Sequence, residues 1–348
     1  MSDNTDKKTT DPHSFDPVKL ATYLEQQVDG FHGPLTATKF PGGQSNPTFA
    51  IEAASGRYVL RRKPPGVLLK SAHAVDREYQ VISALAATDV PVAKVYHLCE
   101  DDSIIGSMFY LMEYIDGTVY WDPALPEVSK EARSAMYDEM NRVLAAMHSV
   151  DINAVGLSDY GKPGNYFERQ ISRWSKQYRA SETETIEPME TLLKWLPENT
   201  PADDGRISLV HGDFRLDNLM FHPSEPKVLA LVDWELSTLG HPFADLAYQC
   251  MQWRLPPDNL PKGLAGLDLN ALGIPSEQEY VARYCKRMGI EHIDNWPFYL
   301  AFSFFRLAAI IQGVKKRALD GNASNKEALA VGKLVRPLST LAVEIITP

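Results

Sequence analysis

Alternating apolar and polar positions dominate the first third of the chain and predict a sheet. Residues 48–52 and 57–63 alternate on either side of a Gly-containing turn, which is the pattern of half-buried strands joined as a hairpin. Residues 92–99 and 107–115 are two more apolar runs of strand length. Two segments differ. Residues 16–28 predict a short amphipathic helix that begins with an Asp cap and a Pro, and residues 71–87 predict a longer helix because their apolar side chains recur at helical spacing. We therefore expect a β-rich unit that contains one long helix.

After residue 129 the apolar positions recur every three to four residues, which predicts helices through most of the remaining chain. The longest apolar run, residues 298–314, is short for a membrane span and contains Arg306, so it predicts a buried core helix. The change near residue 116 divides the chain. We expect an α+β protein with a disordered tail at 1–14, an N-terminal lobe at 15–116 and a mainly helical C-terminal lobe at 117–348.

Composition narrows the possible partners. The 348 residues carry a formal net charge of −10, which argues against nucleic acid or an anionic membrane as the main partner. The cysteines, Cys99, Cys250 and Cys285, are far apart and fit a reducing compartment without zinc spacing. The polar first residues have no apolar segment of the kind that a signal peptide needs. A soluble, cytoplasmic protein is expected.

The candidate chemistry lies in residues 209–235, where a polar run and a turn separate two short apolar segments. The polar run contains Asp213 and Asn218, and the second apolar segment ends at Asp233. Asp and Asn are unfavourable inside strands and helices, so their position among Leu, Val and Met calls for a functional reason. A bound metal and a proton acceptor together supply one.

The motifs in and before this stretch are similar to those of a known family. HGDFRLDN followed by DWE, preceded by LRRKPPG, REYQVISAL and LAAMHSVD, resembles the aminoglycoside phosphotransferase and choline kinase-like family. The likeness is strongest to the kinase-like domain associated with acyl-CoA dehydrogenases, and it runs from about residue 15 to the end. Asn218 follows Asp213 by five positions, as in the protein-kinase template. The resemblance implies the bilobal protein-kinase-like fold, with a small antiparallel sheet in the N-terminal lobe.

The same resemblance implies a role for each polar residue. Asp213 would be the catalytic residue that orients the acceptor hydroxyl and accepts its proton. Asn218 and Asp233 would hold Mg²⁺, which prefers a few oxygen ligands and keeps several waters. His211 and Asp245 would support the catalytic loop. ATP and Mg²⁺ are therefore the expected cofactors.

For the nucleotide, register on the strand at 57–63 puts Arg61 where kinases usually place a phosphate-binding Lys, and makes Glu78 its partner on the neighbouring helix. Lys63 is the alternative cation. The turn at 42–46 would cover the phosphates, although a plain hairpin turn is an equal alternative. The residues expected to contact ATP are Gly43, Ser45, Val59, Arg61, Glu78, Met112, Glu113 and Ile115.

The acceptor is less well specified by the sequence. The resemblance implies a pocket built by the helices near residues 166–178 and 248–253, lined by Trp174, Tyr178, Gln252 and Trp253, although core packing explains these side chains equally well. We expect a phosphotransferase, or small-molecule kinase, that acts on a hydroxyl group. A hydroxyacyl-CoA or a related metabolite is the favoured acceptor, and an aminoglycoside antibiotic is the alternative.

Two functions of other classes remain open at this point. A metal-dependent hydrolase would use a dinuclear cluster, made of His211, Asp213, His222, Asp233 and His241. A non-catalytic nucleotide-binding module is the other alternative, since Arg61 replaces the usual Lys.

Overall fold

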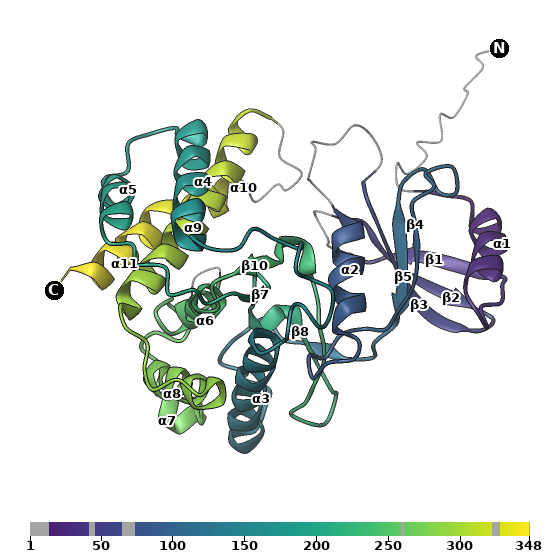
Figure 1. Ribbon diagram of the computed structural model, residues 1–348, viewed down its shortest axis with the longest axis horizontal. Coiled ribbons are helices and arrows are strands. Elements are labelled where there is room, and N and C mark those ends of the chain that lie inside the picture. The colour runs from purple at the N-terminus through teal and green to yellow at the C-terminus, as the bar shows by residue number, and fades with distance from the viewer. Residues whose placement is uncertain (1–13, 42–45, 65–73, 259–260, 322–327, 348) are drawn as a thin grey trace, which may run out of the picture. The chain divides into compact units, whose positions relative to one another are not determined.

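The computed structural model describes residues 14–41, 46–64, 74–258, 261–321 and 328–347. The chain forms two compact units (Figure 1). The first unit holds the described residues up to Ala86 together with Val92–Ile115, and the second holds Ala87–Pro91 together with the chain from Asp116 onward. The α+β fold class, with a sheet in the N-terminal part and helices in the C-terminal part, is confirmed.

The first unit is built on a five-stranded antiparallel sheet in the order β1-β2-β3-β5-β4. Its strands are β1 (Leu35–Lys39), β2 (Thr48–Ala53), β3 (Gly56–Arg62), β4 (Val95–Cys99) and β5 (Phe109–Glu113). Gly56, with φ +135°, sits in the tight turn between β2 and β3, where a residue with a side chain would be strained.

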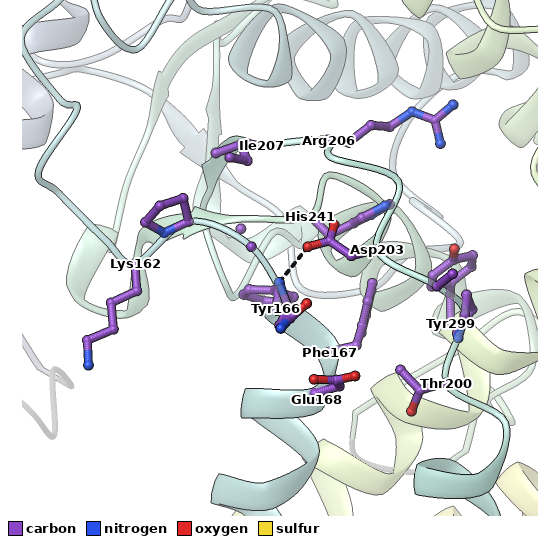
Figure 2. A pocket seen from close by; sticks show the side chains of 16 residues that line it. Lys162, Tyr166, Phe167, Glu168, Thr200, Asp203, Arg206, Ile207, His241 and Tyr299 are labelled. Atoms are coloured by element: carbon purple, nitrogen blue, oxygen red, sulfur yellow. Dashed lines mark hydrogen bonds between the residues drawn. The ribbon is translucent and has the colours of Figure 1, made fainter.

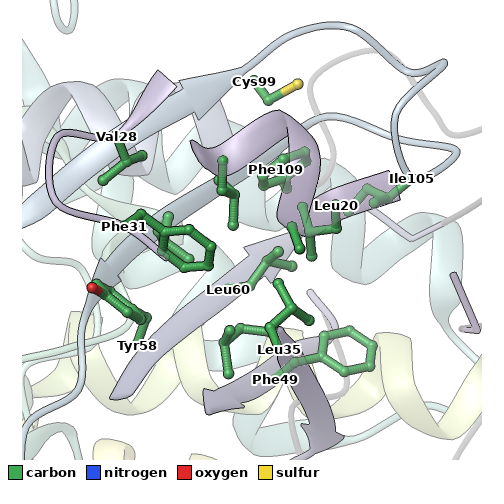
Figure 3. Packing of buried hydrophobic residues seen from close by; sticks show 14 residues of the cluster. Leu20, Val28, Phe31, Leu35, Phe49, Tyr58, Leu60, Cys99, Ile105 and Phe109 are labelled. Atoms are coloured by element: carbon green, nitrogen blue, oxygen red, sulfur yellow. The ribbon is translucent and has the colours of Figure 1, made fainter. Parts of the chain in front are cut away.

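One face of this sheet packs on α1 (Pro17–Gln27). The helix starts where Asp16 accepts hydrogen bonds from the backbone N–H groups of Val18 and Lys19 and Pro17 occupies the first turn. Leu20 and Leu24 then meet the apolar side chains of the sheet in one buried cluster (Figure 3). Further members of the cluster are Phe31, Phe49, Ile51, Leu60, Phe109 and Leu111.

The opposite face of the sheet carries α2 (Val75–Leu85), which contacts β4 and β5. Because side chains alternate along β3, Leu60 joins the α1 cluster while Arg61 points to the α2 side. Arg62 turns back to the α1 face, where it is buried and its Nε donates to Ser107 Oγ at 2.8 Å. The alternation of β3 therefore sends two adjacent arginines to different environments.

The second unit contains two small antiparallel sheets that carry the polar stretch. One has the order β6-β8-β9, and the other pairs β10 with β7. Their strands are β6 (Thr118–Val119), β7 (Ser208–Val210), β8 (Leu219–Phe221), β9 (Val228–Leu231) and β10 (Thr238–Gly240). The short helical turns η1 (Leu216–Asn218) and η2 (Trp234–Leu236) precede β8 and follow β9.

Helices make up the rest of the second unit (Figure 1). They are α3 (Lys130–His148), α4 (Tyr166–Ser181), α5 (Glu187–Glu198), α6 (Phe243–Cys250), η3 (Met251–Trp253), α7 (Leu269–Leu272), α8 (Glu277–Met288), α9 (Trp296–Leu319), α10 (Ala328–Gly332) and α11 (Val335–Ile346).

Helix α9 lies at the centre of these helices and contacts α4, α5, α6, α10 and α11. Within the described ranges it is the one helix whose length and apolar composition would allow a membrane span, and 78% of its apolar window is buried inside the protein. Residues 298–309 are buried on every side of the helix, Arg306 included. A helix that is apolar all round belongs in a core, so the prediction of a buried core helix is confirmed.

Candidate active site

The loop that follows β7 is held by a buried carboxylate. Asp245, in the first turn of α6, has no exposed surface. Its Oδ2 accepts the backbone N–H of His211 at 2.6 Å, and its Oδ1 accepts that of Gly212 at 2.9 Å. Because both oxygens bind consecutive backbone groups, the side chain sets the direction in which the chain leaves β7.

Asp245 is ionised in this setting. Burial by itself would raise its pKa, but a hydrogen bond and charge from His148, the charge of His211 and the N–H of Gly212 outweigh burial and lower the pKa below its ordinary value. His148 Nε2 lies 3.5 Å from Asp245 Oδ2, and its Nδ1 lies 2.7 Å from the Tyr284 hydroxyl. The C-terminal end of α3 thus helps to stabilise the charge that holds the loop.

Gly212 is required at the bend of this loop. Its φ is +84°, and a Cβ added there would lie 2.8 Å from the Leu236 carbonyl oxygen, so any side chain would both strain the backbone and collide with it. The Gly212 carbonyl accepts a hydrogen bond from Arg306 Nη2 at 2.5 Å. The Arg306 guanidinium lies over the rings of Trp174 and Tyr248, at 5.7 and 5.4 Å, within the range of a cation–π contact.

His211 connects the loop to the strand that leads to Asp233. The ring has no exposed surface, and its Nε2 lies 3.0 Å from the Val232 carbonyl. Its Nδ1 accepts the backbone N–H of Asp213 at 3.2 Å, and the ring packs on Trp234 at 4.8 Å between centroids. Both ring nitrogens are therefore engaged in positioning backbone, with the proton on Nε2.

Strand pairing brings the remaining polar residues together. The Nδ2 of Asn218 donates to the Asp213 carbonyl at 2.8 Å and to Asp213 Oδ2 at 3.1 Å. The Val232 N–H donates to the Asn218 carbonyl at 2.9 Å, which extends the pairing of β8 with β9 by one residue. Asp233, the next residue, therefore follows directly beside Asn218, with a left-handed backbone (φ 67°, ψ 58°) that Asp tolerates better than most side chains.

This arrangement fits a hard divalent cation. Because the Asn218 amide nitrogen is turned toward Asp213, its oxygen is the end available to a cation. Among the described residues no group of three or more His, Cys, Asp or Glu side chains gathers to hold a metal. A cation at Asn218 and Asp233 would thus take most of its ligands from phosphate and water, as Mg²⁺ commonly does.

A groove opens beside Asp213. Tyr248 is buried on α6, and its pKa is raised by burial first and then by the charge of the nearby Asp213. Tyr248 also lines a groove of about 440 Å³ between the α6–η3 segment and α9, a size typical of small-molecule sites. The lining is mainly apolar and includes Leu255, Leu307 and Ile311. Tyr248 therefore lies near Asp213, the candidate base, and also forms part of the groove wall.

The first unit holds a separate ion-pair cluster. Arg61 Nε lies 2.7 Å from Glu78 Oε2, and Glu78 is 1% exposed. Glu78 also accepts hydrogen bonds from Asn46 Nδ2 at 2.7 Å and from the Tyr110 hydroxyl at 3.1 Å. Lys63, the alternative cation, pairs instead with Asp76 at 3.4 Å.

The other residues expected at the nucleotide lie on neighbouring strands or outside the described residues. Val59 on β3 and Met112 on β5 are cross-strand partners. Glu113 Oε2 accepts the backbone N–H of Lys94 at 3.3 Å, and Ile115 ends the first unit. Gly43 and Ser45 lie outside the described residues.

The four side chains expected at the acceptor do not gather in one place. Gln252 lines the groove. Trp174 contacts Arg306, and its Nε1 donates to Gln170 Oε1 at 3.0 Å. Trp253 Nε1 donates to the Pro275 carbonyl at 2.8 Å within a cluster of buried aromatic rings, and Tyr178 is fully buried. Of the four, only Gln252 is among the described residues that line the groove.

The residues of the hydrolase alternative are separated by the strands that carry them. In the pairing of β10 with β7, Gly240 lies opposite Ser208 and Thr238 opposite Val210. His241 therefore follows at the start of β7 while His211 follows at its end, roughly 13 Å away at the rise of a strand. His222 is likewise at the far end of β8 from Asn218, where its Nδ1 accepts the Ser224 N–H.

His241 instead belongs to a small cavity at the start of α4 (Figure 2). It stacks on Tyr299 at 5.7 Å between centroids, and its Nε2 lies 3.3 Å from Asp204 Oδ1. Asp203 accepts the backbone N–H of Asn165 at 2.7 Å, the bond drawn in Figure 2. The cavity volume is about 30 Å³, enough for one or two waters.

Sequence reasoning did not single out Tyr248 and Gln249, which both line the groove, or the contact of Arg306 with the loop after β7. Arg306 had a signal, because it is the only charged residue in the apolar run at 298–314. A lone charge in a buried helix needs a partner, but the pattern could not say that the partner was the Gly212 carbonyl. Tyr248 and Gln249 lie in a segment whose aromatic and amide residues have no distinctive spacing.

Comparison with known proteins gives consistent results. Residues 36–280 match the phosphotransferase enzyme family. Mouse acyl-CoA dehydrogenase family member 10 is 52% identical over 94% of this chain, which covers 31% of that protein. A solved structure from Ralstonia eutropha, named provisionally as an aminoglycoside phosphotransferase, is 54% identical with a TM-score of 0.88 and coverage of 95% of this chain and 98% of that one.

Aminoglycoside phosphotransferase APH(4)-Ia, solved with AMP-PNP and hygromycin B, is 14% identical, with a TM-score of 0.63 and coverage of 94% of this chain and 99% of that one. At that identity the likeness concerns the fold. The chain spans between 31% and 44% of the length of the curated relatives it matches.

Proposed function

Since the chain belongs to the phosphotransferase enzyme family, we propose that it transfers the γ-phosphoryl group of ATP to a hydroxyl of a small molecule with the aid of Mg²⁺. The observation that carries this proposal is the set Asp213, Asn218 and Asp233, joined by the Asn218 amide and by the β8–β9 pairing. Phosphoryl transfer needs positioning and charge stabilisation more than covalent chemistry. A rigid set of oxygen ligands beside a carboxylate meets that need.

In the proposed reaction the acceptor hydroxyl oxygen attacks the γ-phosphorus of ATP. The bond between that phosphorus and the β–γ bridging oxygen breaks, the hydroxyl proton passes to Asp213, and ADP leaves. Asn218 holds the Asp213 carboxylate in place, because its Nδ2 donates a hydrogen bond to Asp213 Oδ2. General-base assistance of this kind contributes about 10²–10⁴ in rate.

The metal and the phosphates have different candidate ligands. Asn218 and Asp233 would bind Mg²⁺, which neutralises charge on the β- and γ-phosphates when bound. Arg61, oriented by Glu78, would bind phosphate oxygens, since a guanidinium matches the geometry of a phosphate group. Gly43, Ser45, Val59, Met112, Glu113 and Ile115 complete the proposed nucleotide site.

For the acceptor we favour a hydroxyacyl-CoA or a related metabolite over an aminoglycoside. The apolar lining of the groove beside Tyr248 supports this choice, because an aminoglycoside is polar and cationic. The names of the curated relatives, which contain "acyl-CoA dehydrogenase", point toward acyl metabolism but describe proteins of which this chain matches only a part.

The test is an ADP-release assay of the full chain with Mg²⁺ and ATP over a library of hydroxylated metabolites that includes hydroxyacyl-CoAs and aminoglycosides. We expect turnover that depends on the acceptor and falls at least about 10²-fold in Asp213→Asn. ATP that stabilises the protein thermally but is never turned over would favour the nucleotide-binding module. The absence of both a thermal shift and turnover would contradict the proposal.

A further inference from the structure

The groove beside Tyr248 contains buried amide groups without partners. Gln249 is 2% exposed, and neither its Nε2 nor its Oε1 has a hydrogen-bond partner within the part of the chain that the structure describes. The Nε2 of Gln252 is also buried and unpartnered there. Both glutamines line the groove, and a spacing of three residues puts them on one side of the α6–η3 segment.

Buried amide groups without hydrogen-bond partners lower the stability of the folded protein. A buried amide that makes no hydrogen bond loses its hydration without compensation, and most buried polar groups in proteins are therefore bonded. Gln312 on α9 is equally buried, but its Nε2 donates to the Ser181 carbonyl at 2.7 Å and to Thr183 Oγ1 at 3.1 Å, so that only its Oε1 is left without a partner among the described residues. Gln249 differs because both of its amide atoms are unpartnered among the described residues and because it lines a groove, where a ligand could reach them.

The remaining surface of the groove specifies the rest of that ligand. Leu307 and Ile311 lie four residues apart on α9 and, with Leu255, make an apolar wall. The carboxylates of the lining are already neutralised by their own cations. Asp122 pairs with Lys262 at 2.6 Å, and Asp217 with Arg215 at 2.5 Å. Among the described lining residues, therefore, no excess negative charge is present to hold a polycation.

This inference rests on the phosphotransferase function proposed above. We infer that Gln249, assisted by Gln252, determines specificity by binding the polar end of the acceptor. That end carries a carbonyl and a hydroxyl group, and the rest of the acceptor is aliphatic. The two Nε2 groups donate to the carbonyl oxygen, and Gln249 Oε1 accepts a hydrogen bond. The aliphatic arm lies along the wall formed by Leu255, Leu307 and Ile311. Arg215 and Leu216, which line the same groove, follow Asp213 within three residues, so this end of the ligand lies near the candidate base.

Calorimetric binding to the full chain tests the inference without requiring catalysis. The probes are N-acetylcysteamine thioesters of 3-hydroxy fatty acids with four to ten carbons, the matching deoxy thioesters, and kanamycin. We expect the hydroxylated thioesters to bind, with a gain of about three- to fourfold per added methylene as the arm is buried. The deoxy thioesters should bind about tenfold more weakly for the loss of one buried hydrogen bond, and kanamycin more weakly than either.

The variants separate recognition from folding. Gln249→Leu should bind the hydroxylated thioesters at least about tenfold more weakly while its melting temperature stays at or above that of the wild type, because an unpartnered polar group is removed. Gln249→Met, which has a similar length but no N–H group, should also lose the probe. The control Gln312→Leu should bind normally and melt about 2–4 °C lower, since it loses the hydrogen bonds of its Nε2 to Ser181 and Thr183.

Each contrary outcome has a distinct meaning. Thioesters that fail to bind, binding that is unchanged in Gln249→Leu, or kanamycin as the tightest probe would overturn the inference. Thioester binding that depends on Gln249 but is never followed by phosphoryl transfer would uphold the recognition site and contradict the proposed function. Transfer to other hydroxyl compounds without dependence on Gln249 would do the reverse.

Discussion

Each unit is organised around one buried carboxylate, and the two carboxylates are used differently. Glu78 in the first unit binds side chains, namely Arg61, Asn46 and Tyr110. Asp245 in the second binds backbone, the consecutive N–H groups of His211 and Gly212. A carboxylate that binds a side-chain cation orients a charge, whereas one that binds backbone determines the path of the chain. We therefore expect Glu78 to act mainly on nucleotide affinity and Asp245 mainly on folding and on the catalytic loop.

The most severe test of this contrast is Asp245→Asn. The amide cannot accept two N–H groups as the carboxylate does, and it removes the negative charge next to His148. We expect the free energy of unfolding to fall by about 3–5 kcal/mol, measured by urea denaturation. A loss below about 1 kcal/mol would mean that the loop does not depend on this side chain.

Glu78→Gln should cost less stability and more affinity. Arg61 is 13% exposed and reaches water when its partner is lost, so we expect a loss of about 1–3 kcal/mol and a rise in the KM for ATP of about tenfold. Asp76→Asn is the matched control, because Asp76 pairs with Lys63 at the surface and such pairs contribute at most about 1 kcal/mol. If Glu78→Gln proves as destabilising as Asp245→Asn, the two carboxylates do not differ in the way described.

Gly212→Ala tests whether the loop after β7 needs the backbone conformation of Gly212. The added methyl group would meet the Leu236 carbonyl oxygen at 2.8 Å at a φ of +84°, and we expect a loss of about 1–3 kcal/mol together with a lower kcat. Gly289→Ala is the control, since Gly289 also has a positive φ, of +67°, but no atom near its missing side chain. Equal losses of stability and of kcat in the two variants would show that the clash has no effect.

The smallest expected effect is on acid stability. Because the folded protein lowers the pKa of Asp245 from its ordinary value of 3.8, its ionisation adds stability above that value, and this stability is lost as the pH falls through the lower pKa of the folded state. Wild type should therefore weaken more steeply than Asp245→Asn as the pH falls below about 4. Urea midpoints measured from about pH 5 to pH 3 give the two curves. If the urea midpoints of the two proteins fall in parallel with pH, the lowered pKa of Asp245 does not contribute to stability.

The fold could be predicted from the sequence because the patterns that indicate its strands and helices are local. Alternation along residues 57–63 predicts β3 and the side to which Arg61 points, and the five-residue spacing of Asp213 and Asn218 needs only one turn to bring them together. The apolar run at 298–314, which is short for a membrane span and contains Arg306, likewise predicts that α9 is a buried core helix.

The contacts that hold the site in place could not be predicted from the sequence, because they depend on packing between distant segments. Arg306 reaches the Gly212 carbonyl across 94 positions, and Asn46 reaches Glu78 across 32. No periodicity encodes such pairs. Trp253 does not line the groove, because its indole N–H donates to the Pro275 carbonyl and its ring packs among other aromatic rings. The sequence does not indicate which side of a short helical turn an aromatic side chain will occupy.

Helix α9 has a practical consequence for anyone who evolves this protein toward new acceptors. Arg306, which holds the Gly212 carbonyl, is followed at once by Leu307 in the groove wall. Randomising Leu307 to widen the acceptor range would disturb the helical turn that carries Arg306, so broad libraries at this position should yield many inactive clones. Leu255, which lines the same groove from the segment after η3, offers a place to begin that is separate from the helix holding the loop.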